Sequence, residues 1–256
     1  MISCIYVKTG QKPRTRNNFI NLSISFMIPK TIHYCWFGKG PKSPLIERCI
    51  ESWKTQCPTY SIIEWNEKSF NVESHPFTSR MYSQKKFAFV ADYVRLVALI
   101  RDGGIYLDTD MLLVQPLDTL LATSLLLGKE SDTYISCGMI GATPHHPFIE
   151  AMRKEYDTLT ELRPNPVIMT ELYEKLSPTD VLVLPPNAFY PYDAHHIHEY
   201  QGQNLGPEVY GVHLWNYSWG HPLNKWFKKV GVYHLGKKVV ESLGIKKYLK
   251  KLLGFI

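Results

Sequence analysis

The chain has 256 residues, of which 45% are hydrophobic, so it is long enough to bury one large core and too short for two ordinary enzyme domains. Its formal net charge of +6 sits at the ends, because residues 1–26 carry +4 and residues 236–256 carry +5, which leaves −3 on residues 27–235. That sign argues against a nucleic-acid groove, and no apolar run reaches the roughly 18 to 20 residues of a membrane span or resembles a secretory signal.

The first predicted elements follow a segment without apolar periodicity. Residues 1–26 are expected to form an extension outside the fold, and residues 27–35 predict a strand. A helix is expected between Ser43 and Cys57, because it opens with a capping hydroxyl and a proline in its first turn. Residues 60–65 predict a second strand. Strand, helix and strand at this spacing indicate a parallel sheet with crossover helices.

The middle of the chain continues this alternation. Residues 85–102 predict a longer helix that ends at Gly103-Gly104, and residues 105–107 predict a buried strand. The later patterns are apolar runs at 111–114, 134–140, 181–184 and 209–215 and helical patterns at 148–156 and 167–176. We therefore expect residues 27–235 to form one α/β domain with a mixed, mostly parallel central sheet flanked by helices.

The C-terminal segment, residues 236–256, predicts a basic amphipathic helix. On a helical wheel of residues 245–256, every apolar side chain falls in one arc and all four lysines fall in the other. One interpretation is a terminal helix that docks its apolar face on the domain. The other is a helix that lies in an anionic membrane surface, where each lysine contributes up to about 1 kcal/mol.

The cysteines bear on localisation. Five cysteines are an odd number, and none forms a Cys-x-x-Cys pair, so a disulfide framework or a zinc knuckle is not expected. Reduced thiols are typical of the cytoplasm. Together with the basic C-terminal helix, they predict a cytoplasmic protein held peripherally at the inner face of the cell membrane.

Two aspartates follow the buried strand at 105–107. In an extended chain Asp108 and Asp110 point the same way, so both carboxylates are expected to face one spot at the carboxyl edge of the sheet, where open α/β sheets place ligands. Two converging carboxylates repel unless a cation lies between them, and oxygen ligands suit Mg²⁺ or Mn²⁺. A structural turn is the alternative, since an Asp-x-Asp triplet alone has little specificity.

Further candidate residues lie on either side of these aspartates. Asp92 and Arg95 lie three residues apart on the preceding helix, where they form either an ordinary intrahelical pair or a site for a sugar hydroxyl and a phosphate. His213 opens a stretch that also holds Ser218 and Trp219. A lone histidine is more often structural than a metal ligand, so His213 gains interest only from the aspartates.

An ordered series of motifs resembles glycosyltransferase family 32, the Asp-x-Asp sugar-transferase group that includes capsular polysaccharide enzymes and yeast-type mannosyltransferases. The glucosylating bacterial toxins look like distant relatives. The resemblance spans about 28 to 219. Its segments are Ile28-Pro-Lys-Thr-Ile-His33-Tyr-Cys-Trp36-Phe-Gly, Ser52-Trp53, Trp65-Asn66-Glu67, Ala88-Phe-Val-Ala-Asp92-Tyr-Val-Arg95-Leu, Gly103-Gly-Ile-Tyr-Leu-Asp108-Thr-Asp110, Phe189-Tyr-Pro191 and 213–219.

The resemblance implies a GT-A type fold, a nucleotide-sugar donor, a divalent metal and retention of anomeric configuration. It also implies the roles of particular residues. The donor would be bound by His33, Cys35, Trp36, Asp92, Arg95, Tyr106, Asp108, Ser218 and Trp219, the metal by Asp108, Asp110 and His213, and catalysis would rest on Asp92, Arg95 and Asp110. One residue departs from the pattern: Ala91 stands where the family usually has serine, so a donor contact through that hydroxyl is missing.

The predicted reaction is transfer of a hexose from a UDP-sugar, or else a GDP-sugar, to a glycan or lipid-linked acceptor in surface (capsular) polysaccharide synthesis, with Mn²⁺ or Mg²⁺ as cofactor. No residue stands out as a covalent nucleophile, so front-face attack by the acceptor hydroxyl is favoured. A haloacid-dehalogenase-like phosphohydrolase is one alternative, although Met111-Leu112 stand where its motif has Gly-Thr. A non-catalytic carbohydrate-binding module is another.

Overall fold

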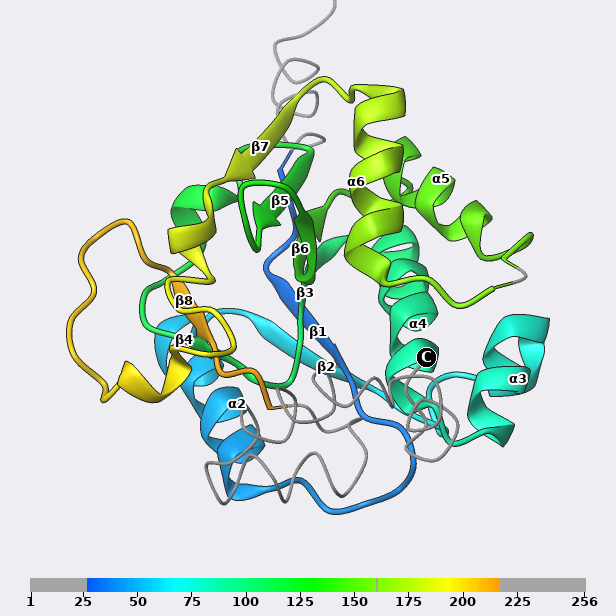
Figure 1. Ribbon diagram of the computed structural model, residues 1–256, viewed down its shortest axis with the longest axis horizontal. Coiled ribbons are helices and arrows are strands. Elements are labelled where there is room, and N and C mark those ends of the chain that lie inside the picture. The colour runs from blue at the N-terminus through cyan, green and yellow to red at the C-terminus, as the bar shows by residue number, and fades with distance from the viewer. Residues whose placement is uncertain (1–26, 160, 217–256) are drawn as a thin grey trace, which may run out of the picture.

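The computed structural model describes residues 27–159 and 161–216 (Figure 1). The predictions for the extension at 1–26, for the amphipathic helix at 236–256 and for Ser218 and Trp219 fall outside these residues. No helix among the described residues has the length and apolar character needed to cross a bilayer. The cysteines at 35, 49, 57 and 137 are buried and free, as expected of reduced thiols.

A six-stranded sheet forms the centre of the fold. Its strands, in spatial order, are β2 (Ser61–Trp65), β1 (Thr31–Cys35), β3 (Gly104–Leu107), β6 (Ile135–Ala142), β5 (Leu125–Lys129) and β7 (Val181–Leu184). β6 is antiparallel to both of its neighbours, and the other three pairings are parallel. The five remaining strands therefore all run one way, which confirms the mixed, mostly parallel sheet.

Helices and a small second sheet cover the two faces (Figure 1). The elements around the sheet are α2 (Pro44–Gln56), α3 (Pro76–Ser83), α4 (Phe87–Asp102), α5 (Pro147–Glu155) and α6 (Asn165–Leu176), with a two-stranded sheet of β4 (Met111–Leu113) and β8 (Gly211–His213). Short 3-10 turns lie at Val72–Ser74, Asp118–Leu120, Pro186–Ala188 and Ile197–Glu199.

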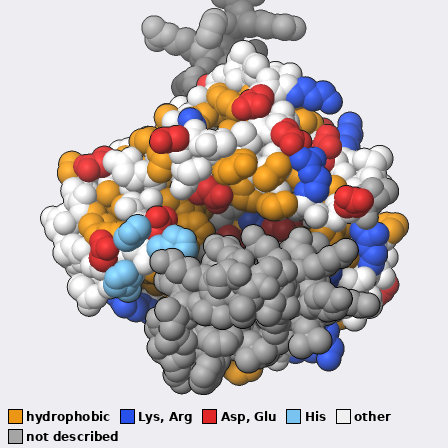
Figure 2. Space-filling view, in the orientation of Figure 1, with side chains coloured by type: hydrophobic (Ala, Val, Ile, Leu, Met, Phe, Trp, Pro, Cys, Tyr) orange, Lys and Arg blue, Asp and Glu red, His pale blue; other side chains and the backbone are white. Residues whose placement is uncertain are grey.

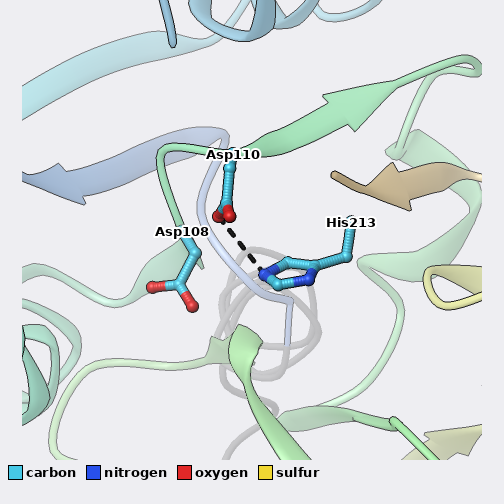
Figure 3. A group of neighbouring side chains, drawn as sticks. All are labelled: Asp108, Asp110 and His213. Carbon is cyan, nitrogen blue, oxygen red and sulfur yellow. Dashed lines mark ion pairs between the residues drawn. The ribbon is translucent and has the colours of Figure 1, made fainter. Parts of the chain in front are cut away.

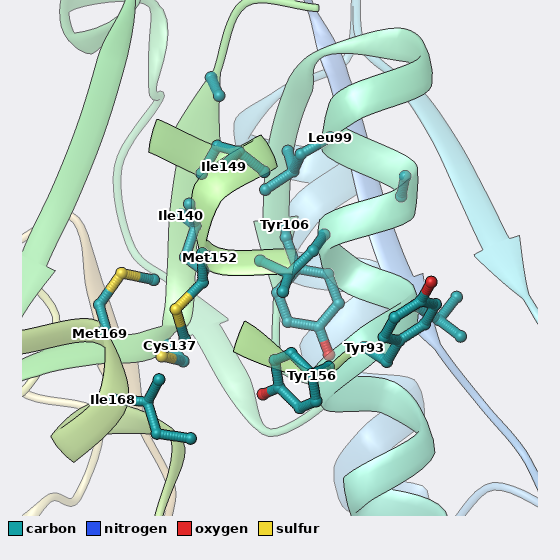
Figure 4. Packing of buried hydrophobic residues seen from close by; sticks show 14 of the residues in the cluster. Tyr93, Leu99, Tyr106, Cys137, Ile140, Ile149, Met152, Tyr156, Ile168 and Met169 are labelled. Carbon is teal, nitrogen blue, oxygen red and sulfur yellow. The ribbon is translucent and has the colours of Figure 1, made fainter. Parts of the chain in front are cut away.

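The core has two parts because strand residues alternate between the faces of the sheet. On one face, Tyr106 and Cys137 pack with residues of α4, α5 and α6 (Figure 4). On the other face, Ile105 and Leu107 pack with α2 and β4, and the Trp53 indole donates a hydrogen bond of 2.7 Å to the Met111 carbonyl oxygen. Both faces of β3 are therefore buried, and packing from both sides holds the strand in place.

The connection from α4 to β3 depends on two glycines. Gly103 and Gly104 have φ of 63° and 101°, and a Cβ on Gly104 would lie 2.5 Å from the Thr31 carbonyl oxygen. The predicted Gly-Gly helix stop is therefore correct, and it turns the chain directly into β3.

The structure differs from the sequence predictions at three elements. The first strand begins at Thr31 rather than at residue 27, because the Thr31 N–H turns back to the Pro29 carbonyl and the Ile28 N–H bonds to Leu121. The helix α3 and the strand β5 were not predicted. β5 reads as a short apolar run with no alternation, a pattern that does not identify a strand by itself.

Candidate active site

The site lies at the carboxyl edge of the sheet. Because β1, β3 and β5 run parallel, the residues that follow them meet at the same edge. Trp36 follows β1, Asp108 follows β3 and Glu130 follows β5. Figure 2 shows Asp and Glu side chains around the recessed middle of one face of the molecule.

A tight turn places the two aspartates. The Met111 N–H donates to the Asp108 carbonyl oxygen at 2.9 Å, so residues 108–111 form a β-turn rather than the extended segment that we expected. The convergence of the carboxylates was therefore predicted for the wrong reason. The turn carries the chain from the central sheet into β4 of the second sheet, and Asp110 stands where β4 begins.

The second sheet brings His213 to the aspartates. β8 pairs antiparallel with β4, with Met111 opposite His213. One ligand atom from each of Asp108, Asp110 and His213 lies within 4.8 Å of the other two (Figure 3). The His213 Nε2 lies 3.2 Å from an Asp110 carboxylate oxygen. The spatial grouping of these three residues agrees with the predicted metal set.

Charges and hydrogen bonds shift the pKa values of Asp110 and His213. Burial alone would raise the pKa of Asp110, but His213 and the N–H of Asn216, which donates at 2.7 Å, hold that pKa below its usual value. Burial would lower the pKa of His213, and Asp110, Asp108 and Glu130 together raise it. The lowered pKa favours the ionised carboxylate of Asp110, and the raised pKa favours a protonated His213 beside it.

The donor set fits a divalent cation. Two carboxylates and an imidazole suit Mn²⁺, and the carboxylates also suit Mg²⁺. Among the described residues, the His213 Nδ1 atom is buried without a hydrogen-bond partner, and Asp108 and Asp110 repel each other. Asp108, Asp110 and His213 would therefore hold the ion, with the remaining positions open to ligands from outside the protein.

Arg95 ties the helix α4 to this site. Its guanidinium, in a side chain only 5% exposed overall, lies 2.7 Å from the Asp92 carboxylate and 3.4 Å from that of Asp108, and it also donates to the Cys137 carbonyl oxygen. It sits 4.5 Å from the centre of the Tyr106 ring. Asp92 and Arg95 are therefore an intrahelical pair that also reaches the metal-site turn.

Asp92 and Tyr106 complete the buried network. The Asn165 amide donates to Asp92 at 3.1 Å, while the Tyr106 hydroxyl donates to Asp108 at 2.9 Å. Burial raises the pKa of Asp92, and the Arg95 guanidinium opposes that shift. Tyr106, which the resemblance placed against the donor, is 1% exposed and acts here by orienting Asp108. Its contact with the donor stays a prediction.

The other predicted donor residues differ in how far they are buried. Trp36 is half-buried at the end of β1, and its indole N–H donates to the Gly40 carbonyl at 2.7 Å, which leaves a ring face as a candidate surface for a nucleobase. His33 is fully buried, with Nε2 bonded to the Gly103 carbonyl and Nδ1 accepting from Trp65. Cys35 is buried in the core. His33 and Cys35 therefore support the fold, and their contact with the donor stays a prediction.

Sequence reasoning gave no site role to two residues at this edge, although Tyr190 lies in the Phe189-Tyr-Pro191 segment of the family resemblance. Tyr190 packs against the His213 ring with its centroid 5.1 Å away and hydrogen-bonds to Ser136. Glu130 follows β5 as Asp108 follows β3, and it interacts electrostatically with both Asp108 and His213. The apolar run before Glu130 could have identified it as a residue at the end of a strand. Because β5 itself was not predicted, Glu130 was not considered.

Residues 43–127 match the family model described as "Glycosyltransferase sugar-binding region containing DXD motif". This segment includes Asp92, Arg95, Asp108 and Asp110. Residues 43–127 are thus similar to that glycosyltransferase family. The matched region contains α2, α4, β3 and the Asp-x-Asp turn, and the mixed sheet of the chain, with that turn at its carboxyl edge, is the GT-A arrangement that the resemblance implied.

Relatives extend the likeness beyond this region. The chain is 31% identical to mannosyl phosphorylinositol ceramide synthase SUR1 of Saccharomyces cerevisiae, covering 51% of this chain and 36% of that protein. It is 26% identical to the alpha-1,4-N-acetylglucosaminyltransferase of Homo sapiens, covering 50% and 42%. Among solved structures, the PaToxG glycosyltransferase is 20% identical and covers 63% of this chain and 75% of that one, with a TM-score of 0.49. The chain thus spans less than half the length of these two curated relatives.

Proposed function

We propose that the chain transfers a hexose from a nucleotide-sugar donor to a glycan or lipid-linked acceptor, with a divalent cation as cofactor and with retention of anomeric configuration. The observation that carries the proposal is the meeting of Asp108, Asp110 and His213 at the carboxyl edge of the sheet, beside the Asp92–Arg95 pair. The family match of residues 43–127 and the names of the relatives agree with it.

The chemistry of the site follows from charge. As the bond between the sugar and the diphosphate breaks, positive charge grows on the sugar and negative charge grows on the leaving group. A divalent cation, when bound, neutralises the diphosphate during that step. Asp108, Asp110 and His213 hold the cation, and Arg95 holds Asp108 in place through their 3.4 Å contact.

The remaining residues serve the donor. Asp92 accepts a hydrogen bond from Asn165, and it would also accept one from a hydroxyl of the transferred sugar. Trp36 offers a half-buried ring to the nucleobase. We propose a UDP-sugar as the donor, with a GDP-sugar as the competing possibility, and a lipid-linked or growing surface glycan of the capsular type as the acceptor.

Donor hydrolysis tests the proposed function. The full chain would be incubated with UDP-glucose, UDP-galactose, UDP-N-acetylglucosamine and GDP-mannose in the presence of Mn²⁺ or Mg²⁺, and the released nucleotide would be measured. We expect turnover of at least one donor and its loss on chelation. Hydrolysis of simple phosphate monoesters in place of sugar nucleotides would favour the phosphohydrolase alternative, and glycan binding without any turnover would favour a binding module.

The proposed location is the inner face of the cell membrane, through the lysine-rich segment 236–256. The full chain should sediment with vesicles that contain anionic phosphatidylserine and should remain in solution with neutral phosphatidylcholine vesicles. Removal of residues 236–256 should abolish sedimentation. Equal sedimentation of the full and shortened chains would overturn this part of the proposal.

A further inference from the structure

Glu130 is a carboxylate at the site for which the proposed function has no role. It follows the last residue of β5, and its N–H donates to the Tyr134 carbonyl at 3.0 Å, which closes the hairpin between β5 and β6. β3 and β5 run parallel with β6 between them, so Glu130 and Asp108 both leave the sheet at the same edge. The backbone therefore fixes Glu130 at the rim of the site.

The surroundings of this carboxylate are charged and partly shielded from water. Glu130 is partly buried, and it interacts electrostatically with Asp108, which repels it, and with His213, which attracts it. It also interacts electrostatically with the buried Tyr190 and Cys137. Burial raises the pKa of Glu130 above its usual value. The side chain thus lies among the same groups that form the metal-site trio.

Within the part of the chain that the structure describes, Glu130 differs from the other acids of the site in lacking a partner. Asp92 is paired with Arg95, Asp108 accepts from Tyr106, and Asp110 pairs with His213. Across residues 27–159 and 161–216, the Glu130 carboxylate forms no hydrogen bond and no ion pair. A partly buried carboxylate without a partner, close to another carboxylate, costs folding free energy. Such a cost is typical of groups that serve function rather than stability.

The cation of the proposed reaction does not account for Glu130. The group of possible ligands that lie within 4.8 Å of one another contains Asp108, Asp110 and His213, and Glu130 is not among them. A divalent charge on the trio is already balanced by its two carboxylates. The group that still needs a nearby negative charge is the transferred sugar, because its ring gains positive charge as the diphosphate leaves.

We propose that Glu130 contacts the transferred sugar and stabilises the positive charge that develops on its anomeric carbon. The inference rests on the proposed function and deepens it. The bond from the anomeric carbon to the diphosphate oxygen breaks, and its electron pair leaves with the diphosphate. The acceptor oxygen bonds to the same carbon, and its proton passes to the departing diphosphate oxygen. Glu130 stays ionised and unbonded throughout, and it acts because its charge is strongest where water is excluded.

Glu130→Gln tests this inference, since the amide keeps the shape and removes the charge. Asp132→Asn is the matched control, because Asp132 is an exposed carboxylate in the same hairpin. We expect Glu130→Gln to lower the kcat for the donor that the wild type hydrolyses by about 100-fold, the order of loss when one stabilising group is removed from a site. Its KM and its affinity for uridine or guanosine diphosphate with Mn²⁺, measured by calorimetry, should stay at the wild-type values.

Two further measurements separate this role from a structural one. The Tm of Glu130→Gln should equal or exceed that of the wild type, because an unpaired carboxylate is removed, and Glu130→Asp should regain part of the lost kcat. A lower Tm would identify Glu130 as a structural residue, and an unchanged kcat would show that its charge does not act on the sugar. Either result overturns this inference while the proposed function stands. Absence of donor turnover in the wild type would overturn both.

Discussion

Two polar regions meet at the carboxyl edge of the sheet, and they differ in how completely their atoms are paired. In the first region, which we call the Arg95 network, the guanidinium contacts Asp92, Asp108 and the Cys137 carbonyl, and Asn165 donates to Asp92. In the second region, the metal-site trio, the His213 Nδ1 atom is buried without a partner in the described part of the chain. The two regions share only Asp108.

This difference indicates different tasks. A buried network in which every member is bonded is rigid, and it is costly to break. A cluster of like charges with unpaired atoms is costly to keep, and it persists where a ligand completes it. We therefore expect the Arg95 network to govern stability and the trio to govern turnover.

Removal of the Arg95 guanidinium should have the largest effect on stability. Arg95→Met leaves Asp92 and Asp108 as partly buried carboxylates without their shared partner, so the free energy of unfolding should fall by about 3 kcal/mol, the lower end of the range for a broken buried pair. Urea unfolding at pH 7.5 measures it. Arg101→Met is the control on the same helix, because that guanidinium pairs with Asp102 at the surface, and its loss should cost about 1 kcal/mol or less. Equal losses in the two variants would contradict a special role for the Arg95 network.

The trio should show the opposite pattern. Asp110→Asn removes one carboxylate from the proposed metal site and should lower donor turnover by about 100-fold to 1,000-fold, together with the affinity for Mn²⁺ measured by calorimetry. The free energy of unfolding should fall by less than in Arg95→Met, because the ion pair with His213 is lost but the amide oxygen can still accept from the Asn216 N–H. Asp118→Asn, at an exposed pair with Lys30, should alter neither quantity. A folded Asp110→Asn protein with full turnover would refute the role of the trio.

The sequence predicted the trio better than it predicted the donor-binding residues. Asp108 and Asp110 were identifiable because an apolar strand leads directly into them, and the grouping with His213 came from the family resemblance. The backbone path was not identifiable. Since Asp110 belongs to a second sheet that only the pairing of β4 with β8 creates, the local pattern could not distinguish a turn from an extended segment.

His33, Cys35 and Tyr106 show what a motif does not specify. A motif identifies which residues lie near a site but not which way each side chain points. Here these three side chains enter the protein interior, and their contact with the donor stays a prediction. Glu130 shows the converse: it reaches the site through a strand whose short apolar run carried no recognisable period.

A smaller effect is expected at the edge of the Arg95 network. Asn165→Leu removes the amide between Asp92 and the Tyr156 hydroxyl, whose bonds to Asn165 measure 3.1 and 2.9 Å. The Tyr156 hydroxyl then loses its partner, and Asp92 keeps only its pair with Arg95. The free energy of unfolding should fall by about 1 to 3 kcal/mol in urea unfolding. Tyr156→Phe removes one partner without touching Asp92 and should cost less. If Tyr156→Phe costs as much as Asn165→Leu, the bond to Asp92 contributes nothing to stability.

The smallest effect is a pH dependence from His33, which belongs with the fully bonded groups. Burial lowers the pKa of His33 in the folded chain, so below about pH 6.5 the unfolded chain binds a proton that the folded chain does not. The free energy of unfolding should therefore decrease as the pH falls from 7.5 to 5.5, with a contribution of at most about 1.4 kcal/mol per pH unit from this residue. Urea unfolding at several pH values measures the slope.

His33→Gln isolates that contribution, because a glutamine amide can still accept from Trp65 and donate to the Gly103 carbonyl without titrating in this range. The variant should show a shallower slope than the wild type. Some slope should remain, since burial also lowers the pKa of His146. His145→Gln, at an exposed position, should keep the wild-type slope. An unchanged slope in His33→Gln would mean that burial does not lower the pKa of His33 in the folded chain.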